Sequence, residues 1–443
     1  MLFKKLNGIH VRHCKNTADS IPQRIPTPKT VCIPMAMHIG APARLTVKAG
    51  DKVKVGTLIG ESGAGLSSAV YSSVSGTVKK IDEIIPIAGN HIPAVIIESD
   101  GEQTLDENIA PYEINSKEGF LSALRQSGIV GLGGAGFPTP VKLSAENSKV
   151  DTLLVNGAEC EPYITSDTRT MIDSADEVAE GIALICKYLE IKTVIIGIEK
   201  NKPSCISTMR KAVSGMDGVI VKSLPSVYPQ GGEKVLAYHT TGRIIPQGKL
   251  PLDVGLIVMN CTTVATIARF IKTGMPLVEK CVTVDGSAVK EPKNLIVPIG
   301  TPIGELIDSC GGFAEPVRKV LYGGPMMGVS VPDLKSPILK QTNAVIFMGE
   351  KEATPPVVTP CIKCGACISA CPFSLDPTAI SKAYKSNEPQ MLEKLKVDVC
   401  MECGCCSYVC PAKRNIVQRN KMAKTMLRDY KLKQKQREEK KNG

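Results

Sequence analysis

Two copies of one cysteine pattern constrain the C-terminal part of this chain more than any other feature of its sequence. The first copy has the spacing Cys-x2-Cys-x2-Cys-x3-Cys-Pro and begins at Cys361, and the second copy repeats that spacing from Cys400. Three thiols so close in sequence, with a fourth beside a proline, are typical ligands of a metal centre. Any fold of this region must therefore bring eight thiols together around two centres.

The repeated pattern matches the ligands of a bacterial ferredoxin-like domain with two [4Fe–4S] clusters. In such a domain each copy supplies three thiolates to one cluster and its fourth thiolate to the other cluster. We therefore expect one cluster on Cys361, Cys364, Cys367 and Cys410, and the second on Cys400, Cys403, Cys406 and Cys371. A domain of this kind transfers single electrons.

Two other interpretations of these cysteines compete with the clusters. A zinc ribbon needs two Cys-x2-Cys pairs and leaves the third cysteine and the trailing Cys-Pro unexplained. Disulfides suit small secreted chains, whereas this chain has 443 residues, and no apolar stretch follows residues 1–5, so we expect no export signal. Cys405 breaks the spacing and is expected to be a bystander thiol. The eight cysteines from Cys14 to Cys310 are expected to be mostly small buried hydrophobic residues.

Length and composition predict a globular chain of about three or more domains. Hydrophobic residues make up 43% of the chain and charged residues 22%, which is ordinary for a globular protein. No stretch reaches the roughly 18 uninterrupted apolar residues of a membrane span. The most apolar stretch, residues 255–271, contains Asn260 and Arg269, so we expect a buried strand that leads into a helix.

Most of the net charge of +11 lies at the C-terminal end of the chain. Residues 413–443 contain twelve Lys/Arg and three Asp/Glu, which gives +9 and leaves +2 for the rest. We expect no nucleic-acid partner, because the chain has no tryptophan, 4% aromatic residues and no recognition motif beside the charge. The basic tail is either a solvated segment or an attraction for anionic lipid or an acidic protein.

Short strands separated by tight turns predict an all-β domain in residues 1–110, which begins with an extended arm. Residues 47–60 and 75–78 resemble the barrel-sandwich fold of biotinyl and lipoyl carrier domains. Those domains carry their cofactor on a hairpin lysine, but no lysine lies between Lys54 and Lys79. The resemblance therefore implies a barrel-sandwich scaffold without the carrier function.

Strands alternate with helices in residues 111–275, which predicts a Rossmann-like α/β domain with a largely parallel sheet. Ligands of such sheets bind beyond the carboxyl ends of the strands, where Asn156 falls. We expect buried strands at 151–156, 193–198, 218–224 and 255–260, and helices at 173–189 and 202–213.

Short strands return in residues 276–350, where we expect a small β-grasp domain and a return segment. The proline-rich residues 353–360 predict a linker into the ferredoxin-like domain, which is expected at 351–420. Residues 421–443 form the basic tail. The expected fold class is multidomain, with α/β and α+β domains.

The glycine-rich residues 131–139 are the second informative motif. Glycines at this density let a phosphate approach backbone N–H groups closely. Such a loop alone usually indicates a flexible turn, but two neighbours strengthen the interpretation. They are Lys142, placed to meet a phosphate, and the polar stretch 156–162 at a predicted strand end.

The sequences Gly-Gly-Ala-Gly-Phe-Pro-Thr and Asn-x-x-Glu-x-Glu-Pro resemble the flavin- and NADH-binding subunit of respiratory complex I and its hydrogenase relatives. Residues 228–234 and Asn260 extend this resemblance, and residues 280–312 are similar to the soluble-ligand-binding β-grasp (SLBB) domain of that family. The resemblance implies an FMN between the two loops, with NAD(H) stacked against it. The residues expected at these cofactors are Gly131, Gly133, Gly134, Gly136, Phe137, Lys142, Asn156, Glu159, Glu161, Gly231, Glu233 and Asn260.

Individual roles can be suggested for three of these side chains. We expect Asn156 to hydrogen-bond the isoalloxazine edge, and Glu159 and Glu161 to bind ribityl or ribose hydroxyls. No catalytic side chain is assigned, because a flavin supplies the chemistry that turns a hydride into single electrons, and the protein sets its position and potential.

The chain departs from the complex I pattern at three positions. Leu132, Ala158 and Gly232 stand where an arginine, an acid and a glutamate are usual, and two clusters replace one. With the β-rich N-terminus, these departures make nearly the whole chain similar to the RnfC family, a component of the Rnf complex. That family implies a peripheral protein on the cytoplasmic face of the plasma (inner) membrane, with no transmembrane span of its own, held by the other Rnf subunits. It also implies electron exchange between NAD(H), FMN and two [4Fe–4S] clusters, coupled by the complex to Na⁺ or H⁺ transport.

Two alternative functions fit the same motifs. An NADH-dependent cobalamin reductase of similar layout would pass its electrons to a cobalt corrin. An electron-wire subunit would keep the clusters but only a vestigial flavin site, which Ala158 and Gly232 make plausible.

Overall fold

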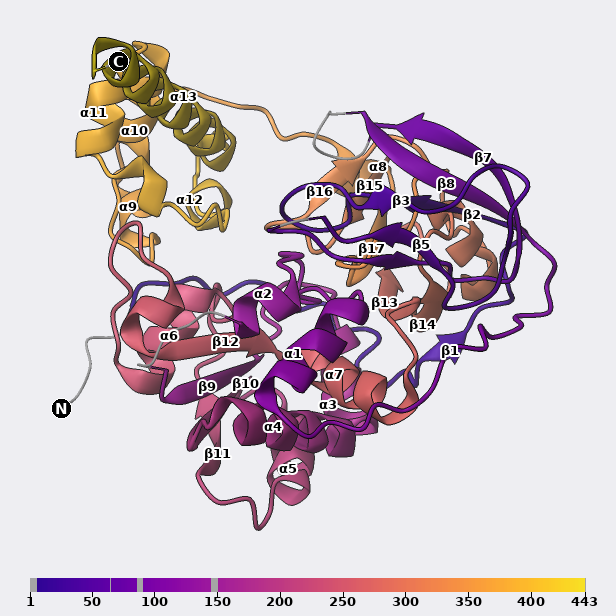
Figure 1. Ribbon diagram of the computed structural model, residues 1–443. Coiled ribbons are helices and arrows are strands. Elements are labelled where there is room, and N and C mark those ends of the chain that lie inside the picture. The colour runs from indigo at the N-terminus through magenta and orange to yellow at the C-terminus, as the bar shows by residue number, and fades with distance from the viewer. Residues whose placement is uncertain (1–5, 64, 86–90, 145–149, 443) are drawn as a thin grey trace.

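The computed structural model describes residues 6–63, 65–85, 91–144 and 150–442. Residues 1–5, on which the expectation about an export signal depends, lie outside this described part. Figure 1 shows a β-rich N-terminal unit, a parallel α/β unit, a second β-rich unit and a helical C-terminal unit. The fold is therefore multidomain with α/β and α+β units, as the sequence predicts. Across the described ranges, no helix combines the length and the apolar character needed to cross a membrane.

The N-terminal unit consists of two small antiparallel sheets that share a core. Strand β2 alternates between partly exposed and buried positions, and its Val31 and Ile33 are fully buried, as the two-residue period of a strand requires. Ile59 and Ile97 join them in the same core. The strand order is β2 (Thr30–Pro34), β8 (Ile92–Ser99), β7 (Gly76–Ile84) and β4 (Lys52–Val53) in one sheet, and β3 (Arg44–Leu45), β5 (Leu58–Glu61) and β6 (Val70–Tyr71) in the other.

The α/β unit contains a four-stranded parallel sheet with helices on both faces. Leu153, Leu154 and Val155 are consecutive and fully buried, as expected for a strand that is covered on both sides. The strand order is β11 (Val219–Leu224), β10 (Thr193–Glu199), β9 (Thr152–Gly157) and β12 (Leu256–Asn260). The helices are α1 (Lys117–Gln126), α2 (Thr139–Leu143), α3 (Ser166–Asp173), α4 (Ala175–Leu189), α5 (Pro203–Ala212), α6 (Glu233–Thr241) and α7 (Cys261–Thr273).

The second β-rich unit is one six-stranded sheet that also includes a strand from the N-terminal arm. Strand β1 (Gln23–Arg24) pairs in parallel with β14 at the edge of this sheet, so the arm crosses from one end of the chain to another unit. The remaining strands in order are β14 (Lys293–Pro298), β13 (Glu279–Asp285), β17 (Ala344–Met348), β15 (Lys319–Tyr322) and β16 (Val329–Val331).

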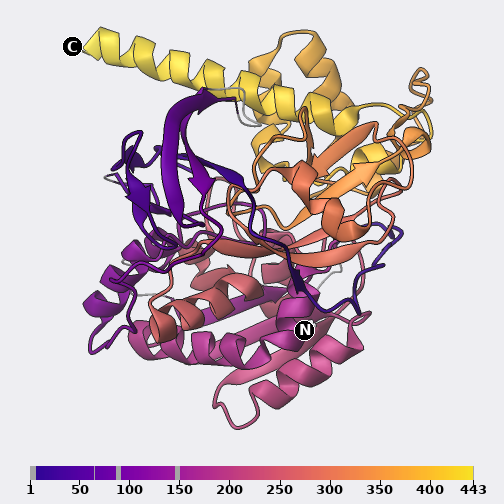
Figure 2. The same cartoon turned by 90° about the vertical axis from the view of Figure 1, so that its right-hand side faces the viewer.

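The C-terminal unit is helical. Helix α13 (Ile416–Asn442) packs Ala423 and Leu427 against α10 and α11, and both side chains are buried there. Its second half extends away from the body of the protein, as Figure 2 shows, so the basic tail forms a helix. The other helices are α8 (Glu350–Ala353), α9 (Ala366–Ser369), α10 (Pro377–Lys385), α11 (Pro389–Lys394) and α12 (Cys405–Tyr408).

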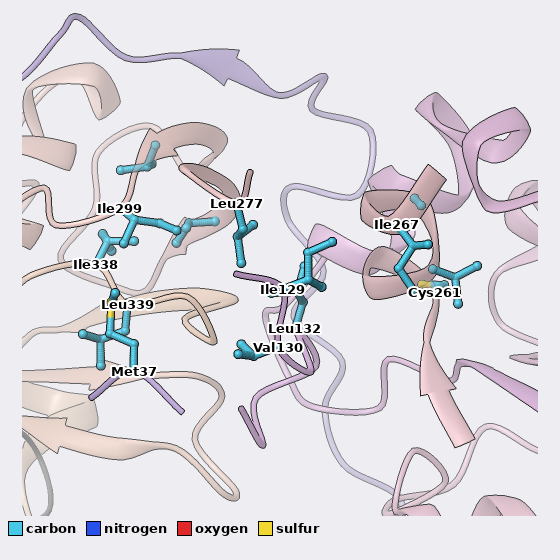
Figure 3. Close-up of a cluster of buried hydrophobic side chains, with 14 of the residues drawn as sticks. Met37, Ile129, Val130, Leu132, Cys261, Ile267, Leu277, Ile299, Ile338 and Leu339 are labelled. Atoms are coloured by element: carbon cyan, nitrogen blue, oxygen red, sulfur yellow. The ribbon is translucent and has the colours of Figure 1, made fainter. Parts of the chain in front are cut away.

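One hydrophobic core joins the first three units beneath the glycine-rich loop. Figure 3 shows Ile129, Val130 and Leu132 lying between Leu277, which precedes β13, and Cys261 at the start of α7. All five side chains are buried. Because the residues at the beginning of the loop are fixed in this core, its backbone is held at the carboxyl edge of the parallel sheet.

Candidate functional site

A cavity of about 640 Å³ lies where the parallel sheet ends. Asn156 and Asn260 are register partners at the carboxyl ends of β9 and β12, and both line this cavity. The glycine-rich loop and residues 228–233 form two walls. Eleven of the twelve predicted cofactor residues line the cavity: Gly131, Gly133, Gly134, Phe137, Lys142, Asn156, Glu159, Glu161, Gly231, Glu233 and Asn260.

Gly136 is the predicted cofactor residue that does not line the cavity. A Cβ built on Gly136 would lie 3.6 Å from Gln341 and from the backbone of His38, so this glycine packs against the N-terminal unit. Its backbone has φ = +64°, and its carbonyl accepts a hydrogen bond from the N–H of Ile39. Gly136 therefore shapes the loop from behind.

A second cavity, of about 670 Å³, lies on the other side of the glycine-rich loop. Leu132 lines it, and the buried ammonium of Lys280 donates to the Leu132 carbonyl at 2.7 Å. The charged residues Arg169 and Arg24 in its walls are paired with Asp173 and Glu279. The smaller cavity is the better candidate site, because the predicted cofactor residues gather there.

The glycine-rich loop presents unpaired backbone donors to the smaller cavity. The N–H groups of Gly133, Gly134 and Ala135 have no acceptor among the residues that the structure describes, and all three residues line the cavity. Gly134 has φ = +108°, a backbone conformation that only glycine adopts without strain. Successive free N–H groups form a concave anion site, so this loop can hold phosphate oxygens.

Lys142 on α2 reaches the same cavity. Its Nζ donates to the Val258 carbonyl at 2.9 Å, lies 3.5 Å from Glu233 Oε1, and lies 5.8 Å from the centre of the Phe137 ring. A lysine ammonium has three donors, so one remains for a ligand. The side chain is 28% exposed, which leaves its charge only partly screened by water.

The two strand-end asparagines are engaged with the protein. Asn156 donates to the Gly231 carbonyl at 2.9 Å and accepts from the Ala158 N–H at 3.0 Å. Asn260 accepts from the Thr263 N–H at 3.1 Å, and so caps the N-terminus of α7. These bonds fix the loops around the cavity, and the bond predicted between Asn156 and an isoalloxazine remains a prediction.

Glu159 directs its carboxylate toward the start of α3. The carboxylate accepts from the Asp167 N–H at 2.8 Å, the Thr168 N–H at 3.3 Å and the Thr168 hydroxyl at 2.7 Å. Lys15 lies 4.0 Å away, and its ammonium donates to the Glu159 and Glu161 carbonyls. Burial raises the pKa of Glu159, and the positive charge of Lys15 opposes that rise. These contacts give Glu159 a structural role in holding the cavity wall.

Glu161 is buried between the cavity and the C-terminal unit. Its carboxylate accepts from the Met326 N–H at 3.0 Å and from the Tyr228 hydroxyl at 3.2 Å. Burial raises the pKa of Glu161. A Cβ on Gly324 would lie 2.2 Å from its Oε2, so the carboxylate requires glycine there. Glu161 therefore ties two walls of the cavity together.

A third wall of the cavity comes from the second β-rich unit, and sequence reasoning missed it. It consists of residues 322–324, 327–329, 339 and 341–343. The buried Gln341 Oε1 has no hydrogen-bond partner in the described part of the chain, so it is free to accept one from a ligand. The glycines at 323, 324 and 328 are the only hint that the sequence offers.

The three positions that depart from the complex I pattern differ in where their side chains point. Leu132 is 2% exposed and packs in the core of Figure 3, whereas Ala158 and Gly232 line the cavity. A Cβ on Gly232 would lie 2.3 Å from Cε of Met401, a residue of the second cysteine loop that also lines the cavity. Gly232 therefore lets that loop approach the cavity closely.

The cysteines are arranged as two groups. All seventeen are free thiols, which excludes the disulfide alternative. Cys367 and Cys410 are buried in one hydrophobic cluster, and Cys361 and Cys364 are exposed. A small cavity of about 20 Å³ has among its walls all four cysteines assigned to the second centre, namely Cys371, Cys400, Cys403 and Cys406. The donor set and this shared cavity fit the predicted division of ligands.

Four protein families match successive parts of the chain, in the order of the four units. They are the RnfC barrel sandwich hybrid domain over residues 3–102, the Nuo51 FMN-binding domain over 124–269, the SLBB domain over 281–330 and the 4Fe-4S dicluster domain over 360–414.

Two relatives cover most of the chain, and both are RnfC proteins. The one from the proton-translocating ferredoxin:NAD(+) oxidoreductase complex of Clostridium ljungdahlii is 41% identical over 387 residues, which are 86% of this chain and 84% of the relative. The one from the Na(+)-translocating ferredoxin:NAD(+) oxidoreductase complex of Acetobacterium woodii is 40% identical over 385 residues, or 86% of this chain and 87% of the relative.

Among solved structures, an NAD+-reducing [NiFe]-hydrogenase in the H2-reduced state has a similar fold. The TM-score is 0.50 at 17% identity, and the alignment covers 69% of this chain. This chain spans 61% of the hydrogenase chain. At that level of identity the likeness concerns the fold alone.

Proposed function

Since the chain belongs to the RnfC family of ion-translocating ferredoxin:NAD⁺ oxidoreductase complexes, we propose that it is the subunit at which NAD(H) exchanges electrons with such a complex. Its domain content gives it FMN and two [4Fe–4S] clusters as cofactors. We place it at the cytoplasmic face of the plasma (inner) membrane, held there by the other subunits. The complex couples the electron flow to transport of Na⁺ or H⁺.

One observation carries the assignment of the flavin site: three free N–H groups and a lysine ammonium line the same cavity. Gly133, Gly134 and Ala135 supply the N–H groups, and Lys142 supplies the charge. Together they would hold the FMN phosphate. The chemistry that FMN supplies when bound is the conversion of a hydride into single electrons.

The remaining residues give this cavity its shape and limit access of water. Asn156 fixes the Gly231 loop, Asn260 caps α7, and Glu159 caps α3. Gln341 offers a free amide oxygen to a flavin or nicotinamide N–H. NAD(H) binds in the part of the cavity that FMN leaves open, between the glycine-rich loop and the third wall.

The alternatives predict different results for the purified protein. The two relatives with 40–41% identity favour the Rnf family over a cobalamin reductase. A vestigial flavin site would leave the 640 Å³ cavity without FMN.

Anaerobic purification with iron, sulfide and flavin measured together tests the proposal. We expect about eight irons and one FMN per chain. Zinc in place of iron, or protein that cannot be loaded with FMN, would contradict it.

A further inference from the structure

The second cysteine loop is docked on the wall of the flavin cavity. Met401, between Cys400 and Cys403, lines the cavity and packs against Gly232. The Tyr228 hydroxyl, whose residue also lines the cavity, donates to the Cys403 carbonyl at 2.7 Å. The centre that this loop holds is therefore separated from the cavity by little more than one side chain.

Further contacts fix this loop in place. Gly404 has φ = +82°, and a Cβ there would lie 2.9 Å from the Met326 carbonyl, so the backbones approach closely. On the N-terminal arm, Asn7 donates to the Cys371 carbonyl at 3.3 Å, and Ile9 pairs with Tyr228 through two backbone hydrogen bonds. Figure 1 shows the result, in which the C-terminal unit stands beside α6 and the end of β12.

The first cysteine loop has the opposite surroundings. Cys361 and Cys364 are exposed, and Ile362 between them is 67% exposed. Val357 is 84% exposed and precedes this loop. A hydrogen bond from the Thr359 N–H to the Ala412 carbonyl, 3.1 Å long, brings this apolar surface beside the exposed basic residues Lys363 and Lys413.

We infer that the relay has a fixed order in space, in which the centre on Cys371, Cys400, Cys403 and Cys406 faces the flavin and the centre on Cys361, Cys364, Cys367 and Cys410 faces a protein partner. The inference deepens the proposed function and rests on it. The partner is an electron-transfer protein whose redox centre is surrounded by an acidic and partly apolar surface. Such a surface complements exposed apolar side chains within a basic rim.

The electrons balance along this order. Oxidation of one NADH yields NAD⁺, a proton and two electrons. The two electrons pass one at a time to the cavity-side centre, then to the outward centre, and each reduces a partner by one electron. The same order operates in reverse when the partner is the donor.

Electron paramagnetic resonance of dithionite-reduced protein tests the order with two matched ligand variants. Cys361→Ser removes a ligand of the outward centre, and Cys400→Ser removes a ligand of the cavity-side centre. The probes are a soluble dysprosium(III) chelate, which speeds the spin relaxation of centres near the surface, and FMN added to flavin-free protein.

We expect the dysprosium effect to be kept in Cys400→Ser and lost in Cys361→Ser. The effect of FMN on the cluster signal should follow the reverse pattern. A dysprosium effect kept in Cys361→Ser and lost in Cys400→Ser would overturn the inference. Should Cys400→Ser not fold, Met401→Ala keeps every ligand, and it should weaken the FMN effect and leave the dysprosium effect unchanged; an unchanged FMN effect would overturn the contact.

Flavin and iron are measured in each sample, which separates this inference from the proposed function. Protein that binds no FMN would contradict the proposed function, whereas the dysprosium comparison needs no flavin and tests the order alone. For the partner surface the probe is a small acidic ferredoxin. Its electron exchange should slow in Lys363→Glu and not in the control Lys211→Glu on α5, and equal rates would contradict the assigned partner chemistry.

Discussion

Replacing Lys142 with methionine should weaken FMN binding without weakening riboflavin binding. Methionine keeps the apolar length of the side chain beside Phe137 and removes the charge. The ammonium already donates to Val258 and lies near Glu233, so about one charge-assisted hydrogen bond to the phosphate is lost. Such a bond contributes about 1.5–3 kcal/mol, which corresponds to an increase of about 10- to 150-fold in the FMN dissociation constant.

Quenching of flavin fluorescence on titration with flavin-free protein measures both constants. Riboflavin lacks the phosphate, so the ratio of the FMN and riboflavin constants isolates the contribution of Lys142. Lys234→Met is the control, because the Lys234 ammonium donates to the Pro246 carbonyl on the outer side of α6. If Lys142→Met bound FMN as tightly as the wild type, the phosphate would lie elsewhere. If both flavins weakened equally, the effect would be structural.

Three further predictions concern the packing around the site. A Cβ at position 231 would lie 2.3 Å from the Ala158 carbonyl, so Gly231→Ala should lose bound FMN in absorption spectra, and full retention would contradict the tight approach. Burial lowers the pKa of Lys340 from 10.5 to about 7, so the unfolded chain binds more protons between those pH values and stability rises with pH there. Denaturant unfolding of Lys340→Met should lack this part of the rise, and an unchanged profile would refute it. Leu427→Ala, at a side chain 2% exposed, should lower the unfolding free energy by about 2–5 kcal/mol. Removal of residues 433–443 should change it by less than about 0.5 kcal/mol, and equal losses in thermal melts would place α13 outside the core.

The local signals in the sequence predicted the sheet and the loop at its edge. The four predicted strands appear as β9 to β12 in one parallel sheet, because each is a buried run that alternates with a helix. The glycine-rich loop lies beyond the carboxyl ends of these strands, as the general rule for such sheets requires. The domain limits at 110, 275, 350 and 420 remain predictions.

The partners of polar side chains could not be predicted in the same way. The motif suggests that Glu159 faces a ligand, but its carboxylate meets N–H groups at the start of α3, and that meeting depends on how the loop turns in three dimensions. The wall that contains Gln341 comes from a unit about two hundred residues farther along the chain. No periodicity or motif near residue 341 indicates that it returns to the cavity.

The docking of the cysteine loops was equally invisible in the sequence. The spacing predicts the same chemistry for both copies, yet Met401 packs on Gly232 while Ile362 is exposed. The difference arises from contacts of Tyr228 and the N-terminal arm, which are distant in sequence.

Anaerobic mixing with NADH tests the central claim most directly, because the claim makes FMN in the 640 Å³ cavity the link between NAD(H) and the two centres. Protein is prepared with and without FMN and with its clusters intact, and the loss of cluster absorption is followed after NADH is added. We predict that NADH reduces the clusters of the FMN-loaded protein and leaves those of the flavin-free protein oxidised. Equal reduction of both preparations, or reduction of neither, would contradict the account.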